Sequence, residues 1–551
     1  MVASDSPEAS RIGADVLAAG GNAFDAAVAT SLALGVARPQ STGLGGGGFL
    51  VAYLASEQRC VALDFRETAP AAATPQLYAK LLAESADGPP PTVYGGHAVA
   101  VPGQLAGLAE VNKRFGTRPL GDLAQPAIGL AQTGFAVDEH YRDACRSVLA
   151  ALGKWPQLKE RQPQLYESLR GRGTPPDAGA IVKRPELAAA LRLIAERGPE
   201  AFYRGPIGAT VVKAVQAAGG TLTLDDLAGY RVRERTPLRI TYRARGVAPA
   251  SWIDYEIVTM PPPSSGGVCL AEALNILGAL RRRAGDDGLP GSWSQPEHYP
   301  CCLVTALQHA FADRARWLGD PDFSTIPVSA LTSREYAERL VAKSATQPAD
   351  FGSVQLPDDA GTSHFCVADR HGNVVAMTET INTMFGSLVV AEPYGIILNN
   401  EMDDLTVQPG EPNHFGLLQG QPNVVAPGKR PLSSMTPTIA FRDGRPVLVL
   451  GASGGPRIIS SVLQVMLNVI EFEMPLHEAL SATRLHHQWQ PSEVYFDRPP
   501  PDDLVAALKK AGSTISDSRR EGMVQAIQFL DGGVMVGACD PRKGGRPAGV
   551  K

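Results

Sequence analysis

Paired apolar segments joined by short turns occupy much of the last third of the chain, and they constrain its fold more than any other feature. The turns combine Gly with Asn or Asp, the residues that tight hairpin loops require. The pairs are 364–369 with 374–381, 436–441 with 446–451, and 523–530 with 533–538. The turns are Arg370-His371-Gly372-Asn373, Arg442-Asp443-Gly444 and Asp531-Gly532. This spacing predicts β-hairpins.

Helical patterns lie before and between these hairpins. The first forty residues predict two helices separated by Gly20-Gly21-Asn22, and the first helix begins at Asp5-Ser6-Pro7-Glu8. Other helical segments are 456–471, 501–512 and most of 97–350, and other strand-like segments are 49–55, 60–65 and 395–399. Blocks of strands and helices in this order predict an α+β fold, a layered sandwich of sheets covered by helices.

Composition excludes several classes of function. The chain has 551 residues, of which 44% are hydrophobic and 19% charged, as expected for a soluble globular protein. A net charge of −5 gives no field for binding nucleic acid or an anionic membrane. We expect no membrane span, because no run of about 18 apolar residues occurs. The N-terminal sequence lacks a signal peptide, which predicts a cytoplasmic protein if the chain is complete.

Cysteine and histidine form no recognisable disulfide or metal pattern. The seven cysteines are scattered and include no CxxC pair, so we expect buried or incidental thiols. His486-His487 favours local packing or a surface position over a metal site. No cofactor is expected.

A glycine-rich run, Gly43-Leu44-Gly45-Gly46-Gly47-Gly48, formally matches the GxGxxG dinucleotide motif. That motif requires a strand before it and a helix after it. Here a helix precedes the run and a strand follows it, so the order is reversed. We therefore expect close approach of the backbone to another segment or to a substrate.

Polar residues concentrate in three short segments of the second half. Asn399–Asp404 contains three acids, Pro431–Met435 contains two hydroxyls, and Gly451–Arg457 ends a strand and opens a helix. Free N–H groups at such a helix start suit an oxyanion. Singly, the segments could be a calcium-like acidic turn, a solvated loop and a helix cap. Together they indicate one site.

Ordered motifs extend through the whole chain. Those in the first part are Gly20-Gly21-Asn22-Ala23, Asp25-Ala26-Ala27, the glycine run to Phe49, and Asp64-Phe65-Arg66-Glu67-Thr68-Ala69-Pro70. Those further on are Met260-Pro261-Pro262-Pro263-Ser264-Ser265-Gly266-Gly267, Leu318-Gly319-Asp320-Pro321, Gly361-Thr362-Ser363-His364-Phe365, and the segments Asn399–Asp404, Pro431–Met435 and Gly454-Gly455. In these motifs the chain resembles the γ-glutamyltransferase (glutathione hydrolase) family. The resemblance implies an N-terminal-nucleophile hydrolase with a four-layer αββα sandwich.

The resemblance also implies that one precursor cuts itself into two chains, residues 1–361 and 362–551. Thr362 would attack the carbonyl of Gly361, where a glycine permits a strained backbone. The new α-amine of Thr362, with an ordinary pKa of about 7.7–8.0, would then act as base for its own hydroxyl. Thr380 matches the position that orients this amine, and His364 is expected to be structural.

For substrate, the resemblance implies γ-glutamyl amides such as glutathione, whose glutamyl group is a zwitterion. Arg66 would bind the α-carboxylate with help from Ser433 and Ser434. The α-amine would be held by Asn382, Glu401 and Asp404. The backbone N–H groups of Gly454 and Gly455 would form the oxyanion hole.

The implied reaction is ping-pong, through a γ-glutamyl ester of Thr362 that passes to water or to an amino-acid or peptide acceptor. Two positions depart from some bacterial relatives. Glu401 stands where those relatives have Gln, and Phe415, in the lid segment 408–423, stands where they have Tyr. Phe415 would cover the site without the hydrogen bond that a Tyr makes to the residue equivalent to Asn382.

Two alternatives remain open. A glutaryl or cephalosporin-type acylase of the same fold would bind a substrate without an α-amine, which Asp404 disfavours. An uncleaved, non-catalytic relative would serve in binding. Members of the family are commonly periplasmic or extracellular, which a longer native start would permit here.

Overall fold

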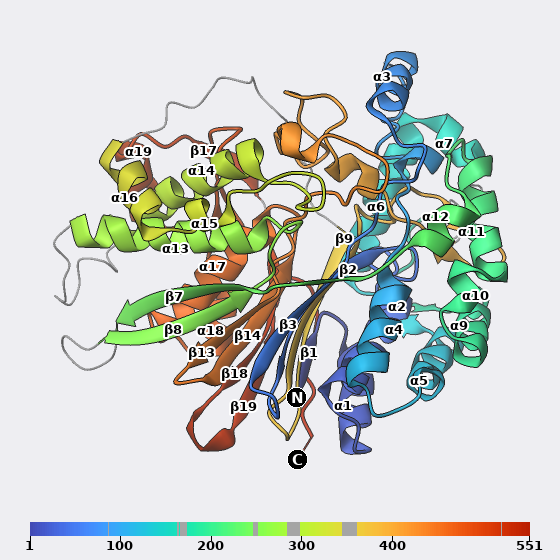
Figure 1. Ribbon diagram of the computed structural model, residues 1–551, viewed down its shortest axis with the longest axis horizontal. Helices are drawn as coiled ribbons and strands as arrows, with labels where there is room; N and C mark the ends of the chain where they lie inside the picture. Colours follow the sequence, from blue (N-terminus) through green and yellow to red (C-terminus); the bar gives the residue numbers. More distant parts are fainter. Residues whose placement is uncertain are drawn as a thin grey trace.

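Two antiparallel sheets, packed face to face, form the centre of the molecule, and helices cover both outer faces (Figure 1). The computed structural model describes residues 1–85, 87–161, 165, 174–245, 252–283, 298–343, 361–519 and 521–550. The four layers confirm the predicted αββα sandwich and its α+β class.

The first sheet combines strands from both ends of the chain. In spatial order its strands are β1 (Val2–Ser4), β9 (Gly361–Ala368), β10 (Val374–Asn382), β2 (Gly47–Leu54), β3 (Arg59–Phe65) and β6 (Arg233–Arg235). The β9–β10 hairpin therefore lies between strands from the first hundred residues. Side chains alternate between faces, as a pleated strand requires. Leu50 and Ala52 of β2 belong to the core under the helices, and Phe49 and Val51 belong to the core between the sheets.

The second sheet is also built from distant segments. In spatial order its strands are β19 (Met535–Cys539), β18 (Met523–Phe529), β14 (Arg445–Ser453), β13 (Thr438–Arg442), β8 (Trp252–Thr259) and β7 (Leu238–Arg245). Both sheets thus contain strands from residues 1–361 and from residues 362–551. The two parts cannot separate without breaking strand pairing within the core.

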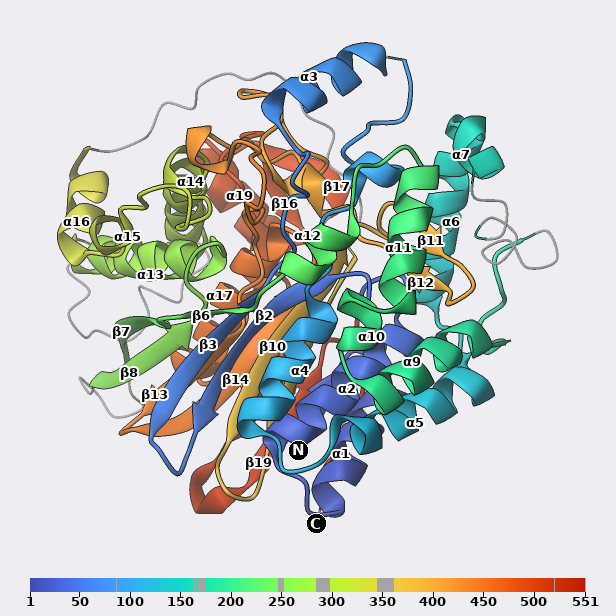
Figure 2. The ribbon, with the colours of Figure 1, turned by 45° about the vertical axis from the view of Figure 1, so that its right-hand side comes forward.

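Helices cover the outer faces in two groups (Figures 1 and 2). The group on the first sheet includes α1 (Pro7–Ala18), α2 (Ala23–Ala37), α4 (Gln104–Phe115), α5 (Leu120–Thr133), α9 (Pro185–Arg197), α10 (Glu200–Tyr203) and α11 (Pro206–Ala217). The group on the second sheet includes α13 (Gly266–Arg283), α14 (Tyr299–Trp317), α15 (Val328–Leu331), α16 (Arg334–Lys343), α17 (Arg457–Ile470) and α18 (Leu476–Ser481). All residues of α2 are buried, which its nearly continuous Ala, Val and Leu sequence permits.

The remaining elements connect or flank these layers. The helices are α3 (Pro75–Glu84), α6 (Glu139–Lys154), α7 (Pro156–Arg161), α12 (Leu224–Gly229), α19 (Asp502–Lys510) and the 3₁₀ turns Gly96–Ala98, Glu401–Asp404, Gln421–Asn423 and Asp531–Gly533. The short strands are β4 (Phe135–Ala136), β5 (Ile181–Val182), β11 (Val390–Ala391), β12 (Ile396–Ile397), β15 (Leu485–His486), β16 (Val494–Phe496) and β17 (Ile515–Arg519). No helix within the described ranges is long and apolar enough to cross a membrane.

The predicted hairpins of the last third are confirmed, and the described part of 97–350 is mostly helical, as predicted. This segment also contributes β7 and β8 to the second sheet, which we did not predict. β7 alternates buried and accessible side chains at the sheet edge, and its sequence alternates apolar and polar residues in the same way, a period of two that our sequence analysis missed. The strand expected over 395–399 is limited to β12, and its neighbours turn away toward the polar segment at 399–404.

The glycine-rich run makes the close backbone approach that we predicted. A Cβ added to Gly45 would lie 2.1 Å from the carbonyl oxygen of Ile397, and one added to Gly46 would lie 2.0 Å from that of Thr380. Side chains at these positions would separate the β9–β10 hairpin from the first part of the chain. The glycines of the run allow close packing of backbone on backbone. The run does not have the strand before it and the helix after it that a dinucleotide-binding motif requires.

A buried carboxyl on β10 is held by helices of the outer layer. Oε2 of Glu379 accepts hydrogen bonds from Oγ of Ser31 at 2.6 Å and from Nε2 of Gln104 at 2.5 Å. Burial raises the pKa of Glu379 from 4.5 to about 8, although these hydrogen bonds oppose the rise. Because the folded pKa lies above the unfolded one, this group's contribution to stability is lost as pH rises from about 4.5 to 8.

Replacing Glu379 by Gln should therefore weaken the dependence of stability on pH. Between pH 6 and pH 9 we expect the wild type to lose about 1–3 kcal/mol more than Glu379→Gln, the cost of burying the ionised group. Thermal midpoints across this range measure the difference. Glu256→Gln, at an exposed position on β8, is the control and should follow the wild type. Parallel curves for Glu379→Gln and the wild type would contradict the assignment.

Candidate active site

A small pocket between the two sheets brings together most of the residues that we predicted from the resemblance. Its lining includes Arg66, Thr362, Thr380, Asn382, Asp404, Phe415, Ser433, Ser434 and Gly455. The other two predicted residues adjoin it: Glu401 contacts Arg66, and Gly454 precedes Gly455. The cavity measures about 20 Å³, room for about one water molecule. A larger ligand can enter only if the lining moves.

The β9–β10 pairing places two hydroxyl groups in contact. Thr362 lies directly opposite Thr380 in the ladder, and their Oγ1 atoms are 3.1 Å apart. The hydroxyl of Thr380 donates to the carbonyl oxygen of Gly361 at 2.5 Å and accepts from the backbone N–H of Asn382 at 2.8 Å. The Thr362 hydroxyl can therefore donate to Thr380. The scissile carbonyl and the proposed nucleophile share one hydrogen-bonding partner.

Gly361 is required for a reason other than the strain that we predicted. It lies in the extended backbone of β9. A Cβ at this position would lie 2.4 Å from the carbonyl oxygen of Thr383 and 2.9 Å from that of Gln40. Close approach of two backbone segments thus excludes any side chain before Thr362.

Asn382 is held in an unusual backbone conformation at the end of β10. Its φ is +76°, and the ladder shifts register between Thr380 and Asn382. Asn tolerates this left-handed region better than most residues, and such strain is found at functional sites. Its Nδ2 donates to the carbonyl oxygen of Asn400 at 3.0 Å. The side chain is therefore fixed beside the acidic segment.

Arg66 follows β3 directly and is almost completely buried, with 1% of its surface exposed. Its guanidinium nitrogens lie 2.6 Å from Oε2 of Glu401 and 2.6 Å from Oδ2 of Asp404, and Nε donates to the carbonyl oxygen of Pro431 at 3.2 Å. A third carboxyl, that of Glu67, lies 3.7 Å away. The predicted ligands for the two ends of a substrate are thus paired with each other.

The carboxyl groups outnumber the cations around Arg66. Burial raises the pKa of Glu67 to about 8 and that of Asp403 to about 7, and it raises the pKa of Glu401 well above its ordinary value. The guanidinium of Arg66 opposes these shifts for Glu67 and Glu401. Burial thus favours the neutral form of these acids, and a cationic group placed beside them would favour their ionised form.

A glycine turn closes the opposite wall. β14 ends at Ser453, Gly454 and Gly455 have φ values of +127° and +58°, and α17 begins at Arg457. Residues other than glycine would be strained at both φ values. Gly455, Pro456 and Ile458 line the pocket, so the N-terminus of α17 faces it. Backbone N–H groups at such a terminus can stabilise developing negative charge.

Two serines complete this wall, and a loop covers the pocket. The Oγ of Ser433 accepts from the backbone N–H of Met435 at 3.1 Å.

In the lid segment, Phe415 is buried and its carbonyl accepts from Nε2 of Gln488 at 3.1 Å. Nδ2 of Asn413 donates to Oδ1 of Asp404 at 3.0 Å. Backbone and amide contacts therefore fasten this lid, which has no tyrosine hydroxyl at position 415.

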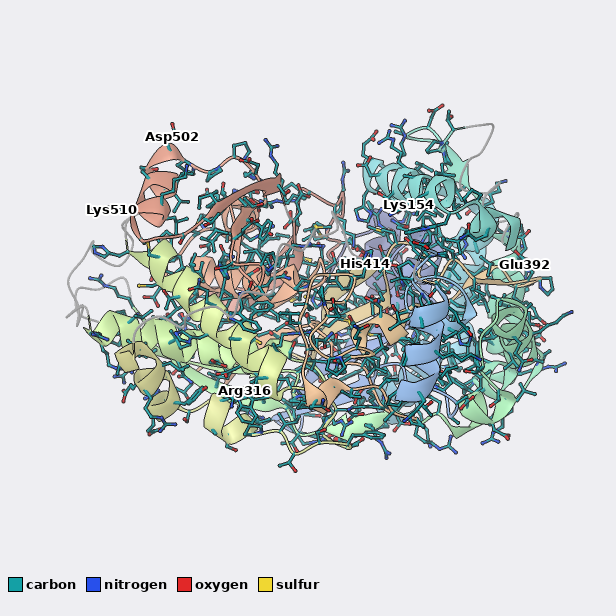
Figure 3. The ribbon with its side chains drawn as sticks, turned by 90° about the horizontal axis from the view of Figure 1, so that it is seen from above. Lys154, Arg316, Glu392, His414, Asp502 and Lys510 are labelled. Carbon is teal, nitrogen blue, oxygen red and sulfur yellow. The ribbon has the colours of Figure 1, made fainter. Side chains whose placement is uncertain are left out.

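Figure 3 places His414, the neighbour of Phe415, near the middle of the molecule, between the helices that cover the two outer faces. This position agrees with a site between the two sheets.

Three residues of this region were not predicted from the sequence. Glu67 was part of a motif without an assigned role, and its buried position beside Arg66 would have required the structure. Asn413 contacts Asp404 from the lid, and Lys543 donates to the carbonyl oxygen of Thr362 at 2.5 Å. No sequence signal marks the last contact, because the two residues are 181 positions apart.

The histidines have structural partners. Buried His364 contacts the hydroxyl of Thr378 at 2.8 Å, and burial lowers its pKa to about 3. His486 lies 2.9 Å from Oγ of Ser460, and His487 lies 3.2 Å from Nε2 of Gln308. Both are buried, as local packing predicts, and neither is at the surface. Among the residues that the structure describes, no group of His, Cys, Asp and Glu could hold a metal ion.

Removing Arg66 should be costly, because the neighbouring carboxyls would lose their cation. We expect Arg66→Met to destabilise the protein by about 3–5 kcal/mol, as when one partner of a buried ion pair is removed. Adding Glu401→Gln should recover part of this loss without restoring turnover of a γ-glutamyl anilide. Thermal midpoints and initial rates test both statements. An Arg66→Met variant as stable as the wild type would contradict the role of these ion pairs.

Comparisons with known proteins agree with this geometry. The profile of the family described as gamma-glutamyltranspeptidase matches residues 9–550. The glutathione hydrolase proenzyme of Escherichia coli (strain K12) is 37% identical over 549 residues, covering 98% of this chain and 90% of that protein. The Acylase ACY 1 proenzyme of Pseudomonas sp. (strain V22) is 38% identical, covering 100% and 93%. A solved cephalosporin acylase from Bacillus halodurans has a TM-score of 0.85 at 28% identity, covering 100% and 95%. The chain belongs to the γ-glutamyltranspeptidase family.

Proposed function

We propose that this protein is a self-cleaving γ-glutamyltransferase with glutathione hydrolase activity, and that Thr362 is its nucleophile. One observation carries the proposal. A threonine hydroxyl that follows a glycine carbonyl shares one pocket with Arg66 and Asp404, the two charges that a zwitterionic γ-glutamyl group needs. Relatives named glutathione hydrolase proenzyme, at 36–38% identity, support the same activity.

Self-cleavage begins with attack of the Thr362 hydroxyl oxygen on the carbonyl carbon of Gly361. The hydroxyl of Thr380 donates to the oxygen of that carbonyl and stabilises the negative charge that develops there. The C–N bond then breaks, the nitrogen of Thr362 gains a proton, and Gly361 remains as an ester on the Thr362 oxygen. Water hydrolyses the ester, which gives chains 1–361 and 362–551.

The cut creates the catalytic base. Before cleavage the nitrogen of Thr362 is an amide and cannot accept a proton. Afterwards it is an α-amine, whose pKa of about 7.7–8.0 leaves a useful neutral fraction near neutral pH. The amine takes the proton of the Thr362 hydroxyl as the oxygen attacks the γ-carbonyl of the substrate. The N–H groups of Gly454 and Gly455 then stabilise the oxyanion.

Substrate binding must exchange ion pairs within the site. The α-carboxylate of the substrate would replace Glu401 and Asp404 on Arg66, with Ser433 and Ser434 beside it. The α-ammonium would then pair with the carboxylates of Asp404 and Glu401 and contact Asn382. Because the empty cavity measures only about 20 Å³, the lid segment has to move to admit the glutamyl group.

The γ-glutamyl ester can be resolved in two ways. Attack by water releases glutamate, and attack by the amine of an amino acid or peptide gives a new γ-glutamyl product. The leaving amine departs before either attack, which makes the reaction ping-pong.

An acylase is the second candidate, because an acylase proenzyme and a cephalosporin acylase are among the similar proteins. A glutaryl group would bring a carboxylate without an ammonium. It would leave Asp404 and Glu401 unpaired once Arg66 turned to the substrate. The acidic residues around Arg66 therefore favour the γ-glutamyl substrate.

Incubation of the purified protein at neutral pH should produce two fragments, the smaller beginning Thr362-Ser363-His364. Thr362→Ala should remain full length and lose activity, because it lacks the attacking oxygen. Intact mass and N-terminal sequencing measure both results. A wild type that stays uncut at 58.1 kDa would favour the non-catalytic relative, and normal cleavage of Thr362→Ala would show that the nucleophile is another residue.

The α-ammonium should decide substrate choice. We expect kcat/KM to be at least about 100-fold higher for γ-glutamyl-p-nitroanilide than for glutaryl-p-nitroanilide, because the latter leaves buried acids unpaired. Asp404→Asn should reduce this ratio, chiefly by slowing the γ-glutamyl substrate. A wild type that prefers the glutaryl anilide would establish the acylase instead.

A further inference from the structure

A lysine near the C-terminus reaches the backbone of the proposed nucleophile. Lys543 follows β19 and has 1% of its surface exposed, although lysine is rarely buried unless it is paired. Its Nζ lies 2.5 Å from the carbonyl oxygen of Thr362, 3.0 Å from Oγ of Ser453 and 2.8 Å from Oδ2 of Asp5. The ammonium donates hydrogen bonds to the first two oxygens and forms an ion pair with the third.

The two hydrogen-bond acceptors belong to opposite walls of the site. Thr362 is the second residue of β9 in the first sheet, and Ser453 ends β14 in the second sheet, immediately before Gly454. Lys543 therefore connects the residue that carries the nucleophile with the turn that would hold the oxyanion.

The start of β9 needs such a contact. On one side β9 pairs with β10 from its first residues, but on the other side its pairing with β1 begins only at Phe365, opposite Ser4. Thr362 thus lies beyond the end of β1. The ammonium of Lys543 provides its carbonyl with a donor where no neighbouring strand is present.

Lys543 is itself held in place by the N-terminal segment. The guanidinium of Arg38 donates to the carbonyl oxygens of Lys543, at 3.1 Å, and Asp5. A Cβ on Gly545 would lie 2.3 Å from the carbonyl oxygen of Ser4, so the two segments pass in contact. Figures 1 and 2 show both chain ends close together at the same end of the molecule. These contacts make Lys543 a fixed anchor.

We propose that Lys543 is a positioning residue that sets the distance between Thr362 and the Gly454–Gly455 turn. This role rests on the proposed function. Once the bond before Thr362 is cut, that residue becomes a chain end without a covalent hold on its N-terminal side, and chain ends fray unless they are tied down. The ammonium of Lys543 holds this chain end by its hydrogen bond to the carbonyl oxygen of Thr362. Because the carboxylate of Asp5 balances the charge of Lys543, we expect Lys543 to act on the position of Thr362 and not on the charge of the site.

The test removes the ammonium without leaving a buried charge, in the double variant Lys543→Met/Asp5→Asn. Displacing a reacting group by about 1 Å can cost about 100-fold in rate. We expect self-cleavage to slow and kcat of the processed enzyme to fall by about 10–100-fold, with KM for a γ-glutamyl anilide within about threefold of the wild type. Both rates are measured on protein whose thermal midpoint shows that it is folded.

Two further variants separate positioning from general stability. Ser453→Ala keeps the ion pair with Asp5 and removes one end of the connection, so it should lower kcat several-fold even if the double variant does not fold. Arg281→Met/Glu471→Gln removes another buried ion pair, whose closest atoms are 2.9 Å apart, far from the pocket. This control should lower the thermal midpoint and leave kcat unchanged.

Wild-type rates in Lys543→Met/Asp5→Asn or Ser453→Ala would overturn the proposal, as would a loss confined to KM or to the folded fraction. Failure of the proposed function would look different. It would appear in the wild type itself, as an uncut chain that does not hydrolyse a γ-glutamyl anilide.

Discussion

The pairing of β9 with β10 is the constraint on which the site depends. It sets Thr362 opposite Thr380 and Gly361 opposite Asn382, so the peptide bond proposed to be cut, the hydroxyl proposed to attack it and their shared hydrogen-bonding partner meet in two neighbouring residue pairs of the ladder. A shift of one residue would turn Thr362 toward the opposite face of the sheet. The register is secured from both sides, by the turn at 370–373 and by the glycine run, whose backbone packs directly on β10.

Around this ladder the structure retains unfavourable features that a purely stable fold would avoid. Arg66 is shared among three buried carboxyls, Asn382 has a positive φ, and the acids have raised pKa values. Arg66, Asn382 and Asp404 line the same pocket, although a buried carboxyl with a raised pKa, that of Glu379, and residues with positive φ, such as Phe385, also occur elsewhere in the fold. Buried carboxyls close together and a strained backbone lower stability, and such features are expected at a functional site, where they serve binding. A zwitterion bound between Arg66 and the acids would offer a carboxylate to the guanidinium and an ammonium to the acids, without changing the net charge of the site.

Much of the fold could be predicted because its signals are local. Turn residues and alternating side chains identify the β9–β10 and β13–β14 hairpins, and Ser6 caps α1 where the sequence indicates a helix start. The β7–β8 hairpin was missed although the sequence of β7 alternates apolar and polar residues with a period of two, because the strands lie within a segment in which helical patterns dominate. The polar segments 399–404, 431–435 and 451–457 indicated a site from the residues themselves, whereas Thr362 and the role of each site residue followed only from the resemblance, since nothing local distinguishes Thr362 from other strand threonines. Lys543 could not be found at all, because its role depends on where the chain ends meet.

The same arrangement explains why an uncut chain would be inactive without a separate inhibitory segment. In the precursor the nitrogen of Thr362 is an amide, so the hydroxyl has no base for an external substrate, although its neighbour Thr380 already polarises the Gly361 carbonyl. The proposed cleavage would change one amide into an amine and leave the surrounding structure in place, because both sheets contain strands from each fragment. Strand pairing across the two fragments would therefore keep the new chain end where it was formed, and that end is the nucleophile that we propose.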